Sequence, residues 1–257
     1  MEMNGVVLAV SGKGGVGKTT VAALLLKALL DAGKESILVI DADPDANLAE
    51  VLGIQVEETV GKVANELKKQ ASAGKLPASI SKREYLEARI FEVLMELPQF
   101  DLLVMGRTEG EGCYCLLNDL LTDIIDKLSN NYEVTLMDME AGLEHLSRRT
   151  DRDVDVMVIV VDGSRLSHLT AKRIKELASE VHINFKRIVV VGNRMEPELE
   201  KALAEKLSAL GLELVGVIPT DQAVASYELE GKSLLSLPKE SPAVKAAAEI
   251  AWKIGLI

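Results

Sequence analysis

Short runs of aliphatic and β-branched residues alternate along the chain with longer segments in which apolar positions recur at helical spacing. The short runs predict about seven strands, at 6–10, 36–40, 102–105, 134–137, 154–161, 187–191 and 212–218. The helical patterns cover 18–31, 116–128, 169–180, 196–210 and 243–254. Because strands and helices alternate, we expect an α/β fold with a doubly wound, mostly parallel sheet and helices on both of its faces.

The segment 57–99 departs from this alternation. It contains two charged helical patterns on either side of a looser stretch, 71–81, which includes Gly74 and Pro77. We interpret it as a helical insertion or flap. A chain of 257 residues can bury a substantial core, and no repeat or linker divides it. The sequence therefore predicts a single domain over 1–257.

A glycine-rich turn joins the first predicted strand to the first predicted helix. It reads Gly12-x-x-x-x-Gly17-Lys18-Thr19, a phosphate-binding motif in the strand-to-helix context that it requires. Backbone N–H groups and the helix N-terminus would surround a polyphosphate, Lys18 would reach its terminal phosphates, and the Thr19 hydroxyl suits magnesium. The predicted nucleotide-binding residues of this loop are Gly12, Lys13, Gly14, Gly15, Val16, Gly17, Lys18, Thr19 and Thr20.

Carboxylates follow two of the predicted strands. The second strand runs into Asp41-Ala42-Asp43-Pro44-Asp45-Ala46-Asn47, and the fourth ends at Asp138. Carboxylates gathered beside a phosphate loop are costly unless a cation or a water network uses them. We therefore expect Asp41 and Asp138, with Thr19, to hold Mg²⁺. Asp45 and Asn47 are equally well explained as turn or helix-cap residues.

Composition narrows the class of protein. The chain is 48% hydrophobic but only 3% aromatic, which suits aliphatic strands buried on both faces. A net charge of −11 argues against general DNA coating, although Arg148, Arg149, Arg152 and Arg165 could form a local basic patch. No apolar run approaches the roughly 20 residues that span a bilayer. We expect a cytoplasmic protein that binds neither nucleic acid nor membrane.

Cys113 and Cys115 are the only two cysteines, and a reducing compartment disfavours a structural disulfide between them. In an extended segment, residues two apart project to the same side. Two thiolates do not close a tetrahedral site, but a twofold dimer would bring four sulfurs together, a ligand set for Zn²⁺ or square-planar Ni²⁺. The alternative is two small apolar residues packed in a loop. His145 could be an exposed residue at the start of a helix, or it could contact a metal or a partner.

The segment from Lys13 to Thr20 resembles the deviant phosphate loop of the MinD/ParA ATPases, a branch of the P-loop NTPases. The resemblance implies an ATP-dependent homodimer in which Lys13 reaches the nucleotide of the partner. It also implies that Asp43, in the Asp-x-Asp-Pro of the first switch, positions or deprotonates the attacking water. Lys13, Lys18 and Asp43 are then the catalytic residues. Asn193, Pro219 and Asp221 resemble the family segments that recognise and flank adenine.

Two further segments resemble one branch of that group, over essentially the full chain. Cys-x-Cys at 113–115 and Glu-Ala-Gly-Leu-Glu-His at 140–145 resemble the CooC-type accessory ATPases that insert nickel into carbon monoxide dehydrogenase. The resemblance implies a metallochaperone that uses ATP and Mg²⁺ and carries Ni²⁺ or Zn²⁺ to a client enzyme. Acetyl-CoA synthase as the client, a MinD/ParA-like positioning ATPase, and an ATP-gated iron–sulfur carrier or reductase stay open as alternatives.

Overall fold

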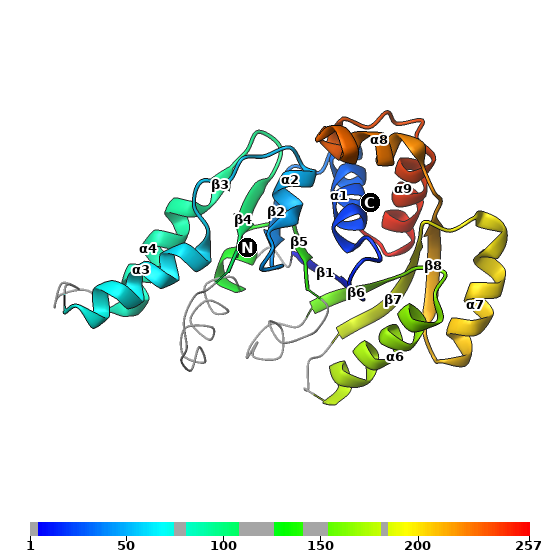
Figure 1. The fold of residues 1–257 in the computed structure, drawn as a ribbon, viewed down its shortest axis with the longest axis horizontal. Coiled ribbons are helices and arrows are strands. Elements are labelled where there is room, and N and C mark those ends of the chain that lie inside the picture. The colour runs from blue at the N-terminus through cyan, green and yellow to red at the C-terminus, as the bar shows by residue number, and fades with distance from the viewer. Residues whose placement is uncertain (1–4, 75–80, 108–125, 141–153, 181–184) are drawn as a thin grey trace.

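The computed structural model describes residues 5–74, 81–107, 126–140, 154–180 and 185–257. Within these ranges, eight strands form one sheet in the order β3-β4-β2-β5-β1-β6-β7-β8 (Figure 1). Every neighbouring pair is parallel except β3 and β4, which are antiparallel. The strands are β1 (Val6–Gly12), β2 (Ile37–Asp41), β3 (Met95–Glu96), β4 (Asp101–Val104), β5 (Val134–Asp138), β6 (Val154–Val161), β7 (Phe185–Asn193) and β8 (Glu213–Ile218).

Helices cover both faces of the sheet. One face packs against α1 (Lys18–Asp31), α2 (Asn47–Val51), α8 (Gln222–Glu230) and α9 (Pro242–Lys253). The other packs against α3 (Val60–Ser72), α4 (Lys82–Val93), α6 (Arg165–Glu180) and α7 (Glu200–Ala209). Two short 3₁₀ helices lie at Pro197–Leu199 and Leu234–Ser236. The α3–α4 pair extends beyond the β3 edge of the sheet (Figure 1).

The strands supply both layers of the core because successive side chains in a strand point to opposite faces. Along β1, Leu8 and Val10 pack toward α1 and α9, whereas Val7 and Ala9 pack toward the other helical layer. All four are 0% exposed. Burial on both faces explains why the strands read as continuous aliphatic runs.

The structure confirms the predicted fold class and corrects the strand count. All seven predicted strands are present, and the eighth, β3, is a two-residue edge strand, too short to produce a sequence pattern. The two helical patterns of 57–99 form α3 and α4. The sequence did not predict α2 or α8. Most of the predicted helix 116–128 lies outside the described residues, and the described part, from 126 to 129, is helical.

The strand register gathers the predicted site at one edge of the sheet. Asp138 at the end of β5 is the register partner of both Asp41 on β2 and Val10 on β1. On its other side β1 pairs with β6, so the chain after Gly12 leaves the sheet between two parallel strand ends. Open α/β sheets bind ligands at the carboxyl ends of strands where the strand order reverses, and β1 occupies that position here.

Candidate functional site

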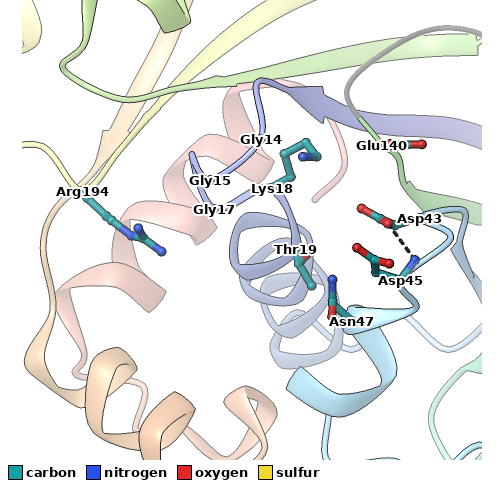
Figure 2. A pocket seen from close by; sticks show the side chains of 10 residues that line it. All are labelled: Gly14, Gly15, Gly17, Lys18, Thr19, Asp43, Asp45, Asn47, Glu140 and Arg194. Atoms are coloured by element: carbon teal, nitrogen blue, oxygen red, sulfur yellow. Dashed lines mark hydrogen bonds between the residues drawn. The ribbon is translucent and has the colours of Figure 1, made fainter.

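The phosphate loop lies at the mouth of a cavity of about 390 Å³. β1 ends at Gly12 and α1 begins at Lys18, whose side chain is buried. The cavity is lined by Gly14, Gly15, Gly17, Lys18, Thr19, Asp43, Asp45, Asn47, Glu140 and Arg194 (Figure 2). Glycine-rich backbone, a buried lysine and the helix N-terminus form the kind of cradle that binds polyphosphate.

Glycine is required at Gly17 for two reasons. Its φ is +87°, and a Cβ there would stand 2.3 Å from the side-chain nitrogen of Asn193. That nitrogen donates a hydrogen bond of 2.9 Å to the carbonyl oxygen of Val16. The end of β7 is therefore tied directly to the phosphate loop.

A second cavity, of about 190 Å³, lies between β7, β8, α1 and α8. Asn193, Pro219 and Asp221, the three residues predicted to contact adenine, all line it. Because the Val16 carbonyl can only accept, the amide of Asn193 must face it with its nitrogen, which leaves Oδ1 as an acceptor. An exocyclic amino group, such as that of adenine, is the complementary donor.

The carboxylate of Asp221 is largely occupied by the protein itself. Its Oδ1 accepts from the Ala223 amide at 2.8 Å, and its Oδ2 accepts from the Ser241 hydroxyl at 2.5 Å and the Ala243 amide at 3.1 Å. Burial alone would raise the pKa of Asp221, but these hydrogen bonds hold it below its usual range. Asp221 caps the N-terminus of α8 and joins it to the start of α9, so it shapes the second cavity.

Helix α8 also brings Glu228 to the second cavity. The Thr20 hydroxyl donates to Glu228 Oε1 at 2.7 Å, so this side chain, predicted to bind nucleotide, joins α1 to α8. Glu228 was not predicted as a site residue because helix α8, which carries it, was not predicted. The signal was present, since Asp221 caps the start of the helix and Gly231, at φ +64°, ends it.

Asp41 organises the loop that follows β2. Its side chain is fully buried and accepts from the amides of Asp43 at 3.2 Å and Leu48 at 2.9 Å. Burial raises the pKa of Asp41 to about 6, while the Leu48 and Asp43 amides oppose the rise. Asp41 does not appear among the residues that line the phosphate cavity.

Asp138 differs from Asp41 in having no hydrogen-bond partner among the described residues. It is 1% exposed, and neither carboxylate oxygen accepts a hydrogen bond from any residue that the structure describes. Burial raises the pKa of Asp138 to about 7. Thr19 and Lys18 lie close enough to oppose the rise, although the Thr19 hydroxyl falls short of hydrogen-bond geometry. An orphaned carboxylate beside a threonine hydroxyl fits a divalent cation.

Asp43 and Asp45 line the acidic side of the phosphate cavity, across Thr19 from Arg194 (Figure 2). Asp43 Oδ1 accepts from the Asp45 amide at 2.9 Å, which tightens the turn after β2. The carboxylate of Asp45 forms an ion pair with Arg107, beyond the end of β4. The loop after β2 is thus connected to the segment that leaves β4.

Lys13 does not appear among the residues that line the phosphate cavity of its own chain. Its ammonium is near Asp162, just after β6. Burial alone would raise the pKa of Asp162, but the hydroxyls of Ser164 and Ser167 and the charge of Lys13 hold it below its usual range. Lys13 therefore has an acidic neighbour in its own chain. Cys113, Cys115, His145 and the arginines at 148, 149 and 152 lie outside the described residues.

A comparison with protein families gives the class of this protein. The model of the CobQ/CobB/MinD/ParA nucleotide binding domain matches residues 7–235. The chain belongs to this family of P-loop nucleotide-binding proteins, and it is an ATPase.

Individual relatives cover nearly the whole chain. The chain is 50% identical over 248 residues to an uncharacterised ATP-binding protein of Methanocaldococcus jannaschii, covering 96% of this chain and 98% of the relative. It is 33% identical over 256 residues to the carbon monoxide dehydrogenase accessory protein CooC of Rhodospirillum rubrum, covering 94% and 92%. A ParA family ATPase from Chlorobium tepidum superposes with a TM-score of 0.72 at 19% identity, covering 98% and 99%. This last likeness concerns the fold alone.

No helix in the described ranges is both long and apolar enough to cross a membrane.

Proposed function

We propose that this protein is an ATP-dependent metallochaperone of the CooC type. In this proposal ATP closes a homodimer, Cys113 and Cys115 of both chains bind a Ni²⁺ or Zn²⁺ cargo, and nickel passes to a carbon monoxide dehydrogenase. The similarity to CooC supports the branch, as do the Cys-x-Cys and Glu-Ala-Gly-Leu-Glu-His segments. The single observation that carries the proposal is the 33% identity to CooC, which extends over 94% of this chain.

The ion pair between Asp45 and Arg107 joins the loop after β2 to the last described residue before the cysteine segment. Asp45 lines the phosphate cavity, and Arg107 precedes Cys113 by six positions. A second connection runs parallel to it, since the Met105 amide donates to the Asp41 carbonyl at 2.9 Å. A nucleotide that rearranges the loop after β2 would therefore act on Met105 and Arg107, which precede the cysteines in the chain. An exposed ion pair adds little to the free energy of unfolding. We therefore propose that this ion pair couples the nucleotide site to the segment after β4.

Hydrolysis is assigned to the phosphate cavity. Lys18 and the backbone of 14–19 hold the β- and γ-phosphates, and Asp43 orients the attacking water. The orphaned carboxylate of Asp138 and the Thr19 hydroxyl would hold Mg²⁺, with Asp41 behind them. When bound, Mg²⁺ neutralises charge on the phosphate oxygens.

Two further roles complete the site. Lys13 leaves its neighbour Asp162 and reaches the nucleotide of the second chain, which makes hydrolysis depend on dimerisation. Asn193 accepts from the adenine amino group through Oδ1, and Pro219 packs against the ring. Guanine carries a carbonyl oxygen where adenine carries that amino group, so we expect a preference for ATP over GTP.

The metal site is tested by elemental analysis of protein loaded with Ni²⁺ in the presence of a non-hydrolysable ATP analogue. We expect about one metal per two chains, because four thiolates complete a single site. The Cys113→Ser/Cys115→Ser variant should lose this metal, while Tyr114→Phe, which keeps both thiols, should retain it. Unchanged metal binding in the double variant would exclude the thiol site.

The same preparation separates the alternatives. An anaerobically purified protein with a brown chromophore would favour an iron–sulfur carrier. Co-sedimentation with DNA or vesicles at moderate salt would favour a positioning ATPase. Copurification with acetyl-CoA synthase would change the client and leave the mechanism as proposed.

A further inference from the structure

Arg194 is the one residue, among those described, that lines both cavities of the site. It directly follows β7, and its side chain is exposed. One of its guanidinium nitrogens lies 3.5 Å from the point where a Cβ on Gly17 would stand. Figure 2 shows the side chain on the opposite side of the phosphate loop from Asp43 and Asp45. Arg194 therefore marks the boundary between the two cavities.

The backbone at Arg194 is strained. Its φ is +56°, in the left-handed region that residues with a long side chain rarely adopt. Both neighbours are held in place, Asn193 through Val16 and Met195 through a 3.2 Å hydrogen bond from its amide to the Ile218 carbonyl. Strain of this kind persists where the surroundings over-determine the backbone, and it clusters at ligand sites.

The guanidinium has no hydrogen bond or ion pair within the described part of the chain. It stands at the edge of a cavity whose opposite side is acidic, with Asp43, Asp45 and Glu140. A guanidinium presents five N–H donors in a planar fork that matches phosphate oxygens. Arg194 is strained and exposed, and it is unpaired among the described residues. Its position beside the phosphate loop therefore indicates that its guanidinium binds an anionic ligand.

We propose that Arg194 binds the α-phosphate of the nucleotide. The inference rests on the nucleotide site proposed above. With the terminal phosphates at Lys18 and the base beside Asn193 and Pro219, the α-phosphate is the anionic group that falls between the two cavities. ATP, ADP and AMP share this group, so Arg194 contributes equally to the binding of all three. Its role is to retain the nucleotide.

The test compares Arg194→Ala with Arg194→Gly in the full chain. Both remove the guanidinium, but only glycine relaxes the left-handed backbone. Displacement of a fluorescent ADP analogue measures the Kd for ADP, for a non-hydrolysable ATP analogue and for AMP. We expect all three Kd values to rise by the same factor, about tenfold, in both variants. Arg194→Lys should recover part of the affinity, because it restores a positive charge.

Lys18→Ala provides the control for the site itself. If Lys18→Ala keeps full affinity for ADP, the proposed nucleotide site is wrong. If Lys18→Ala loses ADP binding while both Arg194 variants bind ADP as wild type does, only the role of Arg194 is wrong. Weaker ADP binding with unchanged AMP binding would contradict the proposal, because it would assign the guanidinium to the β-phosphate. Wild-type affinity in Arg194→Gly with weak binding in Arg194→Ala would trace the effect to the backbone and would also contradict it. Thermal unfolding of each variant without nucleotide verifies that it is folded.

Discussion

Replacing Asp138 by asparagine should stabilise the nucleotide-free protein while abolishing its Mg²⁺-dependent activity. Asp138 is buried, unpartnered in the described structure, and has a pKa raised from 3.8 to about 7. A raised pKa means that the folded state binds the proton more tightly than the unfolded state. The contribution of protonated Asp138 to the free energy of unfolding is fully present below pH 3.8 and is lost as the pH rises through about 7.

The size of the expected stabilisation follows from the pKa shift of Asp138. At pH 8 the ionised carboxylate costs about 4 kcal/mol by linkage, and at pH 5 less than about 2 kcal/mol. Asparagine cannot ionise, so Asp138→Asn should unfold with a free energy about 2–4 kcal/mol higher than wild type at pH 8. The lower end of that range allows for coupling of Asp138 to Asp41. The gain should shrink as the pH falls toward 5.

The assay is urea unfolding of both proteins in EDTA at pH 5, 6, 7 and 8. Asp162→Asn is the matched control with the opposite sign, because hydrogen bonds and Lys13 lower the pKa of Asp162. That variant should be less stable than wild type at pH 8. A lower stability of Asp138→Asn than of wild type at pH 8, or a difference that does not change with pH, would contradict the destabilising charge assigned to Asp138. Adding Mg²⁺ and ADP should stabilise wild type more than Asp138→Asn.

Three further predictions test separate parts of the site. Lys13→Ala should bind ATP normally yet lose both turnover and ATP-dependent dimerisation in sedimentation; near-normal hydrolysis would exclude a role in the partner's site. Asp43→Asn should lower kcat by about 10²–10⁴-fold in a phosphate-release assay with ADP affinity unchanged, and an unaltered kcat would remove it from catalysis. Arg107→Ala and Asp45→Asn should each weaken the dependence of metal binding on nucleotide. The double variant should weaken it no further than either single variant, because both substitutions break the same ion pair. Additive effects would argue against that ion pair as the link.

The parts of the site predicted from sequence were those encoded by local pattern. Residues 12–19 impose a strand, a turn and a helix start within eight positions, so the structure begins α1 at Lys18 as predicted. The strand ends at Asp41 and Asp138 could also be predicted from the sequence, because an apolar run stops at each of these carboxylates. The parallel sheet then explains why they are adjacent.

What the sequence could not show was how each side chain is used. Asp41 and Asp221 were predicted as ligand-binding residues, yet their carboxylates accept hydrogen bonds from backbone amides and a serine within the chain. Thr20 donates to Glu228, which follows it by more than two hundred positions. The position of Arg194 between the cavities likewise depends on contacts between β7, β8 and the phosphate loop. Such long-range partners leave no local periodicity to read.

The most direct test of the account is native mass spectrometry of the protein with Ni²⁺, under thiol-reducing conditions, in three nucleotide states. We expect a dimer with one metal ion and two nucleotides in the presence of a non-hydrolysable ATP analogue, and loss of the metal with ADP. Arg107→Ala should still bind both nucleotides but should no longer couple metal retention to them. Equal metal binding by wild type in the ATP-analogue, ADP and nucleotide-free states would contradict the claim that nucleotide gates the metal site.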